Sequence, residues 1–181
     1  LDATNVIETP LVNVITSLSL DHTGILGDTI EQIATEKCGT LKENGTLVCS
    51  FGQSERAMNV IKDICIKRNN SLIIPDEKAV KVTEQSILGM KFDYKNQLYS
   101  TSMSGIHQVK NMTTVIEAIN VLKTKGYNIT TENIKAGIKK TILPARVEVI
   151  SKKPLVILDG GHNEDGAKAF YNAVKDCFSS N

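Results

Sequence analysis

The chain has 181 residues, of which 41% are hydrophobic and 23% charged, so it can form a packed core and is not a disordered segment. Its 21 lysines and arginines balance 20 acidic residues, and the net charge of +1 provides no strong field for nucleic acid or an anionic membrane. Any anion must therefore be bound at a local site. No apolar run approaches the roughly 20 residues that span a bilayer, and the first residues do not form a signal peptide.

The first part of the chain predicts alternating strands and helices. Residues 11–20 (LVNVITSLSL) form an apolar, β-branched run that is typical of a buried strand. Asp28, with Glu31 three residues later, predicts a capping box for a helix that ends at Gly39. A strand at 46–51, an amphipathic helix at 55–68 and a short strand at 71–74 follow. This order predicts a parallel sheet covered by helices.

The later part of the chain has a different sequence pattern. Residues 79–103 alternate in short stretches around a turn at 95–97, which predicts an antiparallel ribbon. A helix at about 108–125 and a short helix capped by Thr130 follow. Pro144 is the predicted domain boundary between segments 1–143 and 144–181. The second segment contains strands at 147–150 and 155–158 and a helix at about 164–178, the start of a second α/β unit.

Four widely spaced cysteines lie in apolar periodic segments and form no CxxC pair. This pattern is typical of reduced core thiols in a cytoplasmic protein, and not of disulfides or a metal site. They are Cys38, Cys49, Cys65 and Cys177. The chain begins without an initiator methionine and stops just after a helical pattern, so we expect it to be an excerpt of a longer protein.

Two basic residues of the first part could carry chemistry. Lys37 lies on the apolar stripe of the helix that begins near Asp28. Its stem can pack while the ammonium reaches solvent, or burial can favour the neutral amine, which reacts with carbon dioxide to give a metal-ligating carbamate. His22 follows Asp21 at the end of the first predicted strand, where open α/β sheets bind ligands. This dipeptide can hold a metal, supply a base or form only a turn, and with His162 it would also allow a metal hydrolase.

Polar residues of the second part gather at two helix starts. Three polar residues lie in the first turn of the helix that follows Gly105: His107, Gln108 and Asn111. Capping of the helix requires only one of them, although an ordinary helix start remains the alternative to a binding site. Near the end, Asp159-Gly160-Gly161-His162-Asn163 joins a strand to a helix. Free N–H groups at this helix start favour phosphate and the acid suits ribose hydroxyls, whereas the alternative is a tight turn with Asn163 as the N-cap. Arg146 can reach a phosphate as a planar fork or lie on the surface.

Six short segments carry a resemblance to a known family. They are 1–5 (LDATN), 20–23 (LDHT) with 26–27 and 29, 36–39 (EKCG), 105–108 (GIHQ) with 111, 144–148 (PARVE) and 159–163 (DGGHN). In this order they resemble the folylpolyglutamate synthase and dihydrofolate synthase family of the Mur ligase superfamily. The first and fourth segments favour the folate branch over the alternative, a Mur-type amide ligase that acts on a peptidoglycan precursor.

The resemblance implies both a fold and an activity. Segment 1–143 would be part of an α/β ATP-binding central domain with a mostly parallel sheet, covering helices and a short antiparallel ribbon. Segment 144–181 would begin a Rossmann-like C-terminal domain. The implied reaction is ATP-dependent ligation of L-glutamate to folate or dihydropteroate: the γ-phosphate converts a substrate carboxylate to an acyl phosphate, and the amine of glutamate attacks it. The implied protein is a cytoplasmic monomer that binds no nucleic acid and no membrane.

The resemblance also assigns roles by position. It implies ATP and two Mg²⁺ ions, with His22 as a magnesium ligand and Lys37 as the carbamylated lysine at the second magnesium. It further makes Asn111 the adenine contact, Arg146 the linker arginine that reaches the ATP phosphates, Asp159 the ribose-binding residue and His162 a nearby nucleotide contact. These residues argue against a non-catalytic binding module that kept only the fold.

The chain also departs from the family. The family usually has Ala at Cys38, Gly at Ala145 and Ala at Gly161, which are changes between small residues. Its Gly-rich P-loop and a magnesium-sharing glutamate precede the equivalent of Leu1, and most of its C-terminal domain follows the equivalent of Asn181. We therefore expect the 181-residue chain alone to be inactive.

Overall fold

The computed structural model of the protein describes residues 3–20 and 28–178. The chain forms two compact units: Leu1–Pro75 with Thr113–Asn128, and Asp76–Met112 with Ile129–Asn181. Helix α4 (Ile106–Thr124) contributes its residues up to Met112 to the second unit and the rest to the first. The domain division at Pro144 stays a prediction. Among the described residues, no helix is both long and apolar enough to cross a bilayer.

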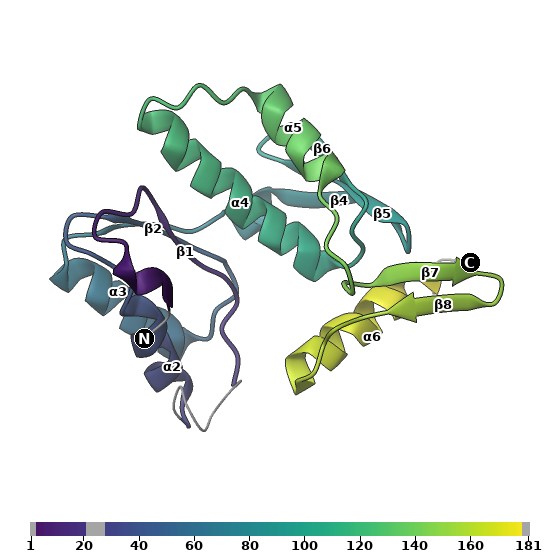
Figure 1. The fold of residues 1–181 in the computed structure, drawn as a ribbon, viewed down its shortest axis with the longest axis horizontal. Helices are drawn as coiled ribbons and strands as arrows, with labels where there is room; N and C mark the ends of the chain where they lie inside the picture. Colours follow the sequence, from purple (N-terminus) through teal and green to yellow (C-terminus); the bar gives the residue numbers. More distant parts are fainter. Residues whose placement is uncertain (1–2, 21–27, 179–181) are drawn as a thin grey trace. The chain divides into compact units, whose positions relative to one another are not determined.

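The first unit contains the predicted parallel sheet. Strands β1 (Asn13–Ile15), β2 (Thr46–Cys49) and β3 (Ser71–Ile73) pair in that order, and all pairs are parallel. The connecting helices are α2 (Ile30–Cys38) and α3 (Glu55–Lys67), and a 3₁₀ turn, η1 (Ala3–Val6), precedes the sheet. Figure 1 labels β1, β2, α2 and α3. The sheet and its helices confirm the α/β class that the sequence predicted.

Strand β1 is much shorter than the predicted strand at 11–20, and a glutamine side chain explains why. Ser50, the residue after β2, donates its backbone N–H to Ile15 O at 2.9 Å. Among the described residues this is the last backbone hydrogen bond between β1 and the end of β2. Beyond it, Gln53 Nε2 donates to Thr16 O at 2.9 Å, and Gln53 Oε1 accepts from Leu18 N at 3.0 Å. The Gln53 amide thus replaces backbone pairing, so the chain leaves the sheet early.

Helix α2 begins one residue later than predicted. The N-cap is Thr29, whose hydroxyl accepts from Gln32 N at 3.3 Å, while Gln32 Oε1 accepts from Thr29 N at 3.2 Å and Asp28 N at 2.8 Å. The predicted Asp28–Glu31 box is therefore wrong: the glutamine amide can accept from two backbone N–H groups, and this fixes the register of the first turn. The helix ends at the predicted Gly39.

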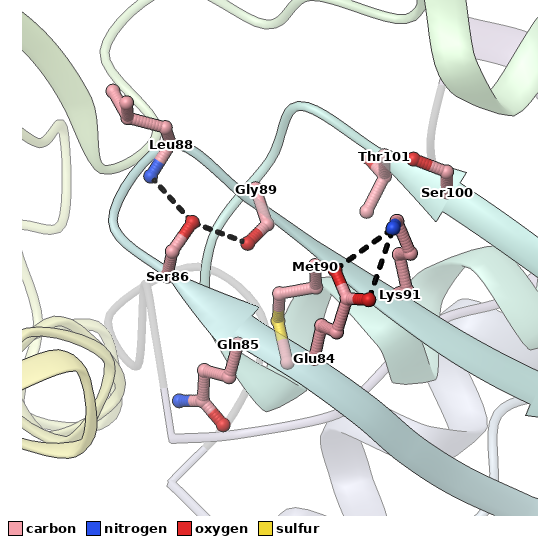
Figure 2. A pocket seen from close by; sticks show the side chains of 9 residues that line it. All are labelled: Glu84, Gln85, Ser86, Leu88, Gly89, Met90, Lys91, Ser100 and Thr101. Atoms are coloured by element: carbon pink, nitrogen blue, oxygen red, sulfur yellow. Dashed lines mark hydrogen bonds and ion pairs between the residues drawn. The ribbon is translucent and has the colours of Figure 1, made fainter. Parts of the chain in front are cut away.

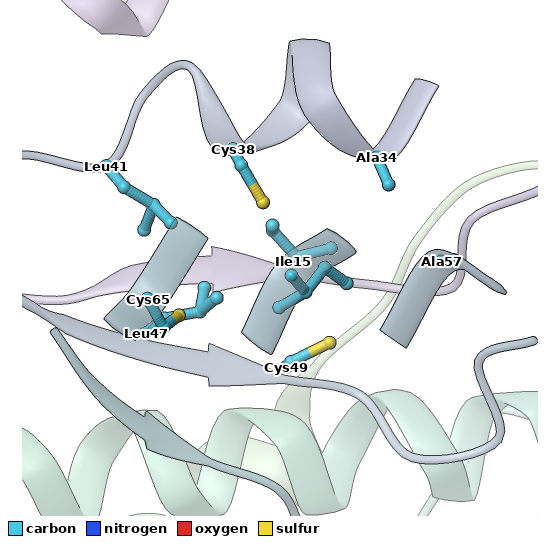
Figure 3. Close-up of a cluster of buried hydrophobic side chains, with 9 residues drawn as sticks. Ile15, Ala34, Cys38, Leu41, Leu47, Cys49, Ala57 and Cys65 are labelled. Atoms are coloured by element: carbon cyan, nitrogen blue, oxygen red, sulfur yellow. The ribbon is translucent and has the colours of Figure 1, made fainter. Parts of the chain in front are cut away.

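A buried cluster fills the space between the parallel sheet and its two helices (Figure 3). Its members are Ile15, Ala34, Cys38, Leu41, Leu47, Cys49, Ala57, Ile61 and Cys65. Cys38, Cys49 and Cys65 are buried thiols, as predicted, whereas Cys177 is partly exposed and is not a core residue. At the edge of the cluster, Arg68 Nη1 donates to Cys38 O at 3.2 Å and to Leu41 O, so this guanidinium satisfies carbonyls at the end of α2.

Burial should protect the Cys38 thiol from alkylation. Burial, with the nearby Cys65 and Cys49, raises the pKa of Cys38 to about 12, and only the thiolate is nucleophilic. We expect iodoacetamide at pH 8 to modify the partly exposed Cys177 in the folded protein and to leave Cys38 unmodified until denaturant is added. Peptide mass spectrometry measures both sites in one sample, and equal alkylation of Cys38 with and without denaturant would contradict this expectation.

The second unit contains the predicted antiparallel ribbon. Strands β4 (Val80–Ser86), β5 (Gly89–Tyr94) and β6 (Gln97–Thr101) pair in that order, after a 3₁₀ turn, η2 (Glu77–Ala79). Lys95 and Asn96 join β5 to β6 with φ of 52° and 62°, the left-handed conformation that a two-residue hairpin turn requires. The ribbon confirms the prediction for 79–103.

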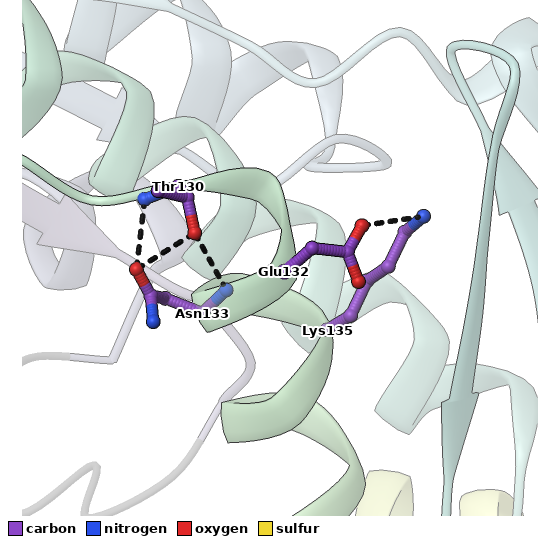
Figure 4. A network of polar contacts seen from close by, with 4 residues as sticks. All are labelled: Thr130, Glu132, Asn133 and Lys135. Carbon is purple, nitrogen blue, oxygen red and sulfur yellow. Dashed lines mark hydrogen bonds and ion pairs between the residues drawn. The ribbon is translucent and has the colours of Figure 1, made fainter.

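Helix α5 (Thr131–Lys140) begins at the predicted cap (Figure 4). Thr130 Oγ1 accepts from Asn133 N at 3.1 Å, and Thr130 N donates to Asn133 Oδ1 at 3.0 Å. An exposed ion pair between Glu132 and Lys135, at 3.5 Å, adds little stability. The chain then forms an antiparallel hairpin, β7 (Glu148–Lys152) and β8 (Leu155–Leu158), and ends in helix α6 (Glu164–Phe178), close to the predicted bounds.

Candidate functional site

Two groups of predicted site residues fall in different units. His22 lies outside the described residues, and Lys37 belongs to the first unit. The other four belong to the second unit; they are Asn111, Arg146, Asp159 and His162. In the second unit, the linker after Pro144 meets the turn between β8 and α6.

The Asp159 carboxylate ties the linker to that turn. Its Oδ2 accepts from Val147 N at 2.9 Å, and its Oδ1 accepts from Gly161 N at 2.7 Å. Beside it, Gly160 N donates to Ala145 O at 2.8 Å. The predicted ribose ligand is thus also the group that holds the backbone around it, and each carboxylate oxygen keeps a second lone pair for a further donor.

The linker backbone is strained at two residues. Ala145 and Val147 have φ of 54° and 52°, a region that L-residues with a Cβ adopt at a cost of about 1–3 kcal/mol each. The neighbouring carboxylates hold this conformation: Glu148 Oε2 accepts from Ala145 N at 2.8 Å, and Asp159 binds Val147 N. The left-handed φ supplies a physical reason for glycine at position 145.

Glycine at position 145 should therefore stabilise the protein. We expect Ala145→Gly to raise the free energy of unfolding by up to about 1 kcal/mol, because relief of strain exceeds the added flexibility of the unfolded chain. Ala167→Gly, in the exposed part of α6, is the matched control and should lower it by about 0.5–1 kcal/mol. Urea unfolding measures both, and a loss of stability in Ala145→Gly would contradict the strain.

The Arg146 side chain is available for an anion. It is exposed, and its guanidinium makes no hydrogen bond or ion pair with any residue that the structure describes. A Cβ on Gly160 would lie 3.1 Å from Arg146 Nη1 and 3.4 Å from Ala145 O, so the absence of a side chain at Gly160 makes room for the arginine. An unpaired guanidinium beside a turn is suited to a phosphate.

His107 also belongs to this cluster, although no role was predicted for it. The ring lies over Gly105, whose φ is 100°: a Cβ on that glycine would be 2.5 Å from the ring Cε1 and 2.7 Å from Nδ1. Burial lowers the pKa of His107, the Asp159 carboxylate raises it and the Arg146 guanidinium lowers it. The charges of the linker arginine and of the acid at the end of β8 therefore reach the ring at the first turn of α4.

The remaining predicted residues flank this cluster. Asn111 Nδ2 donates to Gln108 Oε1 at 3.3 Å, one helical turn after His107. His162 is exposed, and its Nδ1 lies 3.2 Å from Gly160 O. Asn163 Oδ1 accepts from Gly166 N at 2.7 Å, so the N-cap reading of this residue is confirmed. With two acids in its first turn, the start of α6 is a poorer phosphate site than the sequence suggested.

Lys37 lies half-buried in the last turn of α2, as its place on the apolar stripe predicted. Its Nζ makes no hydrogen bond or ion pair with the described part of the chain, whereas its carbonyl accepts from Thr40 Oγ1 at 3.1 Å. No cluster of three or more His, Cys, Asp or Glu side chains among the described residues could hold a metal ion. Both interpretations of Lys37 are compatible with this position.

The sequence and the fold match characterised proteins over almost the whole chain. No protein-family model matches. A dihydrofolate synthase/folylpolyglutamate synthase of Bacillus subtilis (strain 168) is 35% identical, with 99% of this chain and 43% of the relative aligned. A folylpolyglutamate synthase of Lacticaseibacillus casei is 33% identical, with 98% and 43% aligned. A solved folylpolyglutamate synthase complex with AMPPCP and folate is similar with a TM-score of 0.87 and 30% identity, covering 99% of this chain and 45% of that one.

The chain belongs to the folylpolyglutamate synthase and dihydrofolate synthase family. It spans 43% of the length of the two relatives. A folylpolyglutamate synthase of Mycobacterium tuberculosis, solved with ADP and AMPPCP, has the same fold with a TM-score of 0.81 and 26% identity over 98% of this chain and 41% of that one. The resemblance inferred from six short segments is confirmed, and with it the Mur-ligase-type fold.

Family members are ligases. One groove of this chain contains none of the residues predicted to bind the nucleotide or magnesium in that reaction. It has a volume of about 500 Å³ at the end of the β4–β5 hairpin (Figure 2). Lys91 pairs with Glu84 at 2.9 Å, and the Ser86 hydroxyl donates to Gly89 O at 3.0 Å and accepts from Leu88 N at 3.3 Å. Because these polar groups bind one another, we assign this groove no ligand.

Proposed function

We propose that the full-length protein ligates L-glutamate to a folate acceptor at the expense of ATP. One observation carries the proposal: the unpaired Arg146 guanidinium lies against Gly160, the residue that follows Asp159, and the Asp159 carboxylate binds the backbone next to Arg146. A cation for phosphate next to an acid for ribose hydroxyls is the arrangement that a nucleoside triphosphate needs. Relatives that were solved with AMPPCP, and with AMPPCP and folate, support it.

In this proposal the second unit binds the nucleotide. Asn111 contacts the adenine, Asp159 accepts from the ribose hydroxyls, His162 lies against the nucleotide and Arg146 neutralises negative charge on the phosphates. Phosphoryl transfer depends mainly on position and charge compensation, so these contacts would align the γ-phosphate with the acceptor carboxylate. The acyl phosphate then loses inorganic phosphate when the glutamate amine attacks its carbonyl carbon, and an amide forms.

Two magnesium ions also belong to the proposal, with Lys37 and His22 as ligands. The position of Lys37 fits this role, because a half-buried Nζ with no partner among the described residues can form a carbamate, and a carbamate supplies the oxygen ligands that magnesium prefers. Bound there, the metal would neutralise charge on the transferring phosphoryl group. This side chain would hold the ion, and its helix α2 would fix the ligand's position.

Labelled glutamate tests the proposed function. The full-length protein is given ATP, magnesium and either dihydropteroate or a reduced folate, and incorporation is followed separately with each acceptor. Incorporation with either would support the folate ligase, and the two rates would distinguish enzymes with one activity from those with both. No incorporation by a folded protein that binds ATP would favour the Mur-type ligase of a peptidoglycan precursor.

We propose that the full-length enzyme lies in the cytoplasm and is a monomer. It would have no nucleic-acid or membrane partners. A net charge of +1 supports the lack of a nucleic-acid partner. Light scattering of the full-length protein at assay concentration tests the monomer.

A further inference from the structure

Two carboxylates hold the backbone on either side of Arg146. On one side, Glu148 Oε2 accepts from Ala145 N at 2.8 Å. On the other, Asp159 Oδ2 accepts from Val147 N at 2.9 Å. The same hairpin fixes both acids, because Glu148 is the first residue of β7 and Asp159 directly follows β8, its antiparallel partner. Each residue that flanks the arginine therefore has its N–H bound by an acid from a strand end.

We propose that Glu148 is a positioning residue for phosphate binding, which holds Arg146 in the place where its guanidinium meets the nucleotide. The inference rests on the proposed function, in which Arg146 neutralises negative charge on the ATP phosphates. The sequence predicted no role for Glu148. This acid acts through the arginine and touches no phosphate itself, because its carboxylate and the phosphates carry charge of the same sign.

The Ala145 backbone depends on this acceptor because its conformation is strained. Its φ of 54° lies in the left-handed region, which a residue with a Cβ adopts only when its surroundings hold it there. Glu148 binds the N–H of Ala145, and the carbonyl of Ala145 accepts from Gly160 N at 2.8 Å. Without the carboxylate, the N–H loses its partner and the residue relaxes toward a common φ. Ala145 directly precedes Arg146, so this relaxation would move the arginine.

Glu148 fixes the arginine without occupying its guanidinium. The two residues line one groove of about 200 Å³, yet among the described residues they form no ion pair with each other. Arg146 Nη1 instead lies 3.1 Å from the place where a Cβ on Gly160 would stand. An acid paired with the guanidinium would compete with phosphate, whereas an acid bound to the backbone leaves the N–H donors of the arginine to the ligand.

Titration calorimetry of the full-length protein with ADP and with adenosine tests this. We expect Glu148→Ala to bind ADP about tenfold more weakly and adenosine with unchanged affinity, because only ADP has phosphates for the arginine. In an Arg146→Ala background, Glu148→Ala should weaken ADP binding no further. Glu148→Gln keeps an acceptor oxygen and should bind ADP within about threefold of the unmutated protein. Glu148→Asp keeps the charge but is too short to reach Ala145 N, and should bind as weakly as the alanine variant.

Asp93→Ala is the matched control. Asp93 Oδ1 accepts from Asn96 N at 3.1 Å, and Asn96 has a φ of 62° in the turn between β5 and β6. This acid therefore also binds the N–H of a left-handed residue three positions away in the same unit. Its loss should lower the thermal midpoint and leave the affinity for ADP unchanged.

The outcomes separate the inference from the function on which it rests. Unchanged ADP affinity in Glu148→Ala, an equal loss for ADP and adenosine, or a further loss in the Arg146→Ala background would each overturn the role of Glu148 and leave the ligase standing. No ADP binding by the unmutated protein would overturn both. If Glu148→Ala does not fold, the other two variants decide: weaker ADP binding by Glu148→Asp than by Glu148→Gln supports the inference, and equal affinity overturns it.

Discussion

Replacing Lys37 with alanine is expected to lower the rate of glutamate ligation by the full-length protein by about 10²–10³-fold. The lysine lies half-buried in the last turn of α2, with no partner for its Nζ among the described residues. If it carries a carbamate, its loss removes a ligand for the ion that neutralises charge on the transferring phosphoryl group, and single electrostatic groups of this kind are worth about 10²–10³ in kcat. Steady-state incorporation of labelled glutamate by the full-length protein measures the loss.

Chemical rescue distinguishes a carbamate from packing. A short carboxylic acid should restore part of the activity of Lys37→Ala, because it can supply the missing oxygen ligands. Lys37→Met keeps most of the apolar stem and should be as inactive as the alanine variant, yet melt near the unmutated midpoint. Lys62→Ala, an exposed position of α3, is the matched control and should stay active. Full activity in Lys37→Ala would make this lysine a packing residue only.

Replacing Asp159 with alanine is expected to damage stability and nucleotide binding together. The carboxylate accepts from Val147 N and Gly161 N, and hydrogen bonds to charged groups contribute about 1.5–3 kcal/mol each. Because Asp159 is partly exposed, we expect a loss of about 2–4 kcal/mol in the free energy of unfolding, discounted for solvent screening. The strained linker would relax without this carboxylate, so Arg146 would lose its position and the KM for ATP should rise more than tenfold.

A conservative change and a nearby acid complete this test. Asp159→Asn keeps one acceptor oxygen and should fall between the unmutated protein and Asp159→Ala in both urea unfolding and KM. Asp165→Ala removes an exposed acid from the first turn of α6 and should change the stability by less than about 1 kcal/mol. An unchanged KM for ATP in Asp159→Ala would argue against the proposed nucleotide site.

The sequence predicted well those elements whose pattern is local and strong. The helix at 55–68, the ribbon and the capped helix after Thr130 needed only periodicity, a turn pair and a cap. It predicted less well where two neighbouring residue pairs fit the same pattern. Asp28 with Glu31 and Thr29 with Gln32 both match a capping box in the sequence, and only the second forms in the folded protein. The extent of β1 depended on the side chain of Gln53, which belongs to another element.

The candidate site shows the same limit. Arg146 and Asp159 were predicted because their segments resemble a family, and the hydrogen bonds that connect their segments could not be read from the sequence. His107 was noticed in the first turn of its helix but received no role, since its neighbours come from far along the chain. The one local sign in the sequence was Gly105, the glycine over which the His107 ring lies. It has physical meaning only once φ and the position of the ring are known.

The carboxylate of Asp159 also bears on the order in which the chain folds. Val147 and Asp159 are 12 residues apart, and the β7–β8 hairpin between them brings its own ends together. The hairpin has already closed most of this loop, so little chain entropy remains to be lost when the carboxylate reaches the linker. Arg146 and the turn at Gly160 can thus assemble from contacts of short sequence separation, which form quickly. His107 must arrive from a distant segment, so we expect it to join the site last.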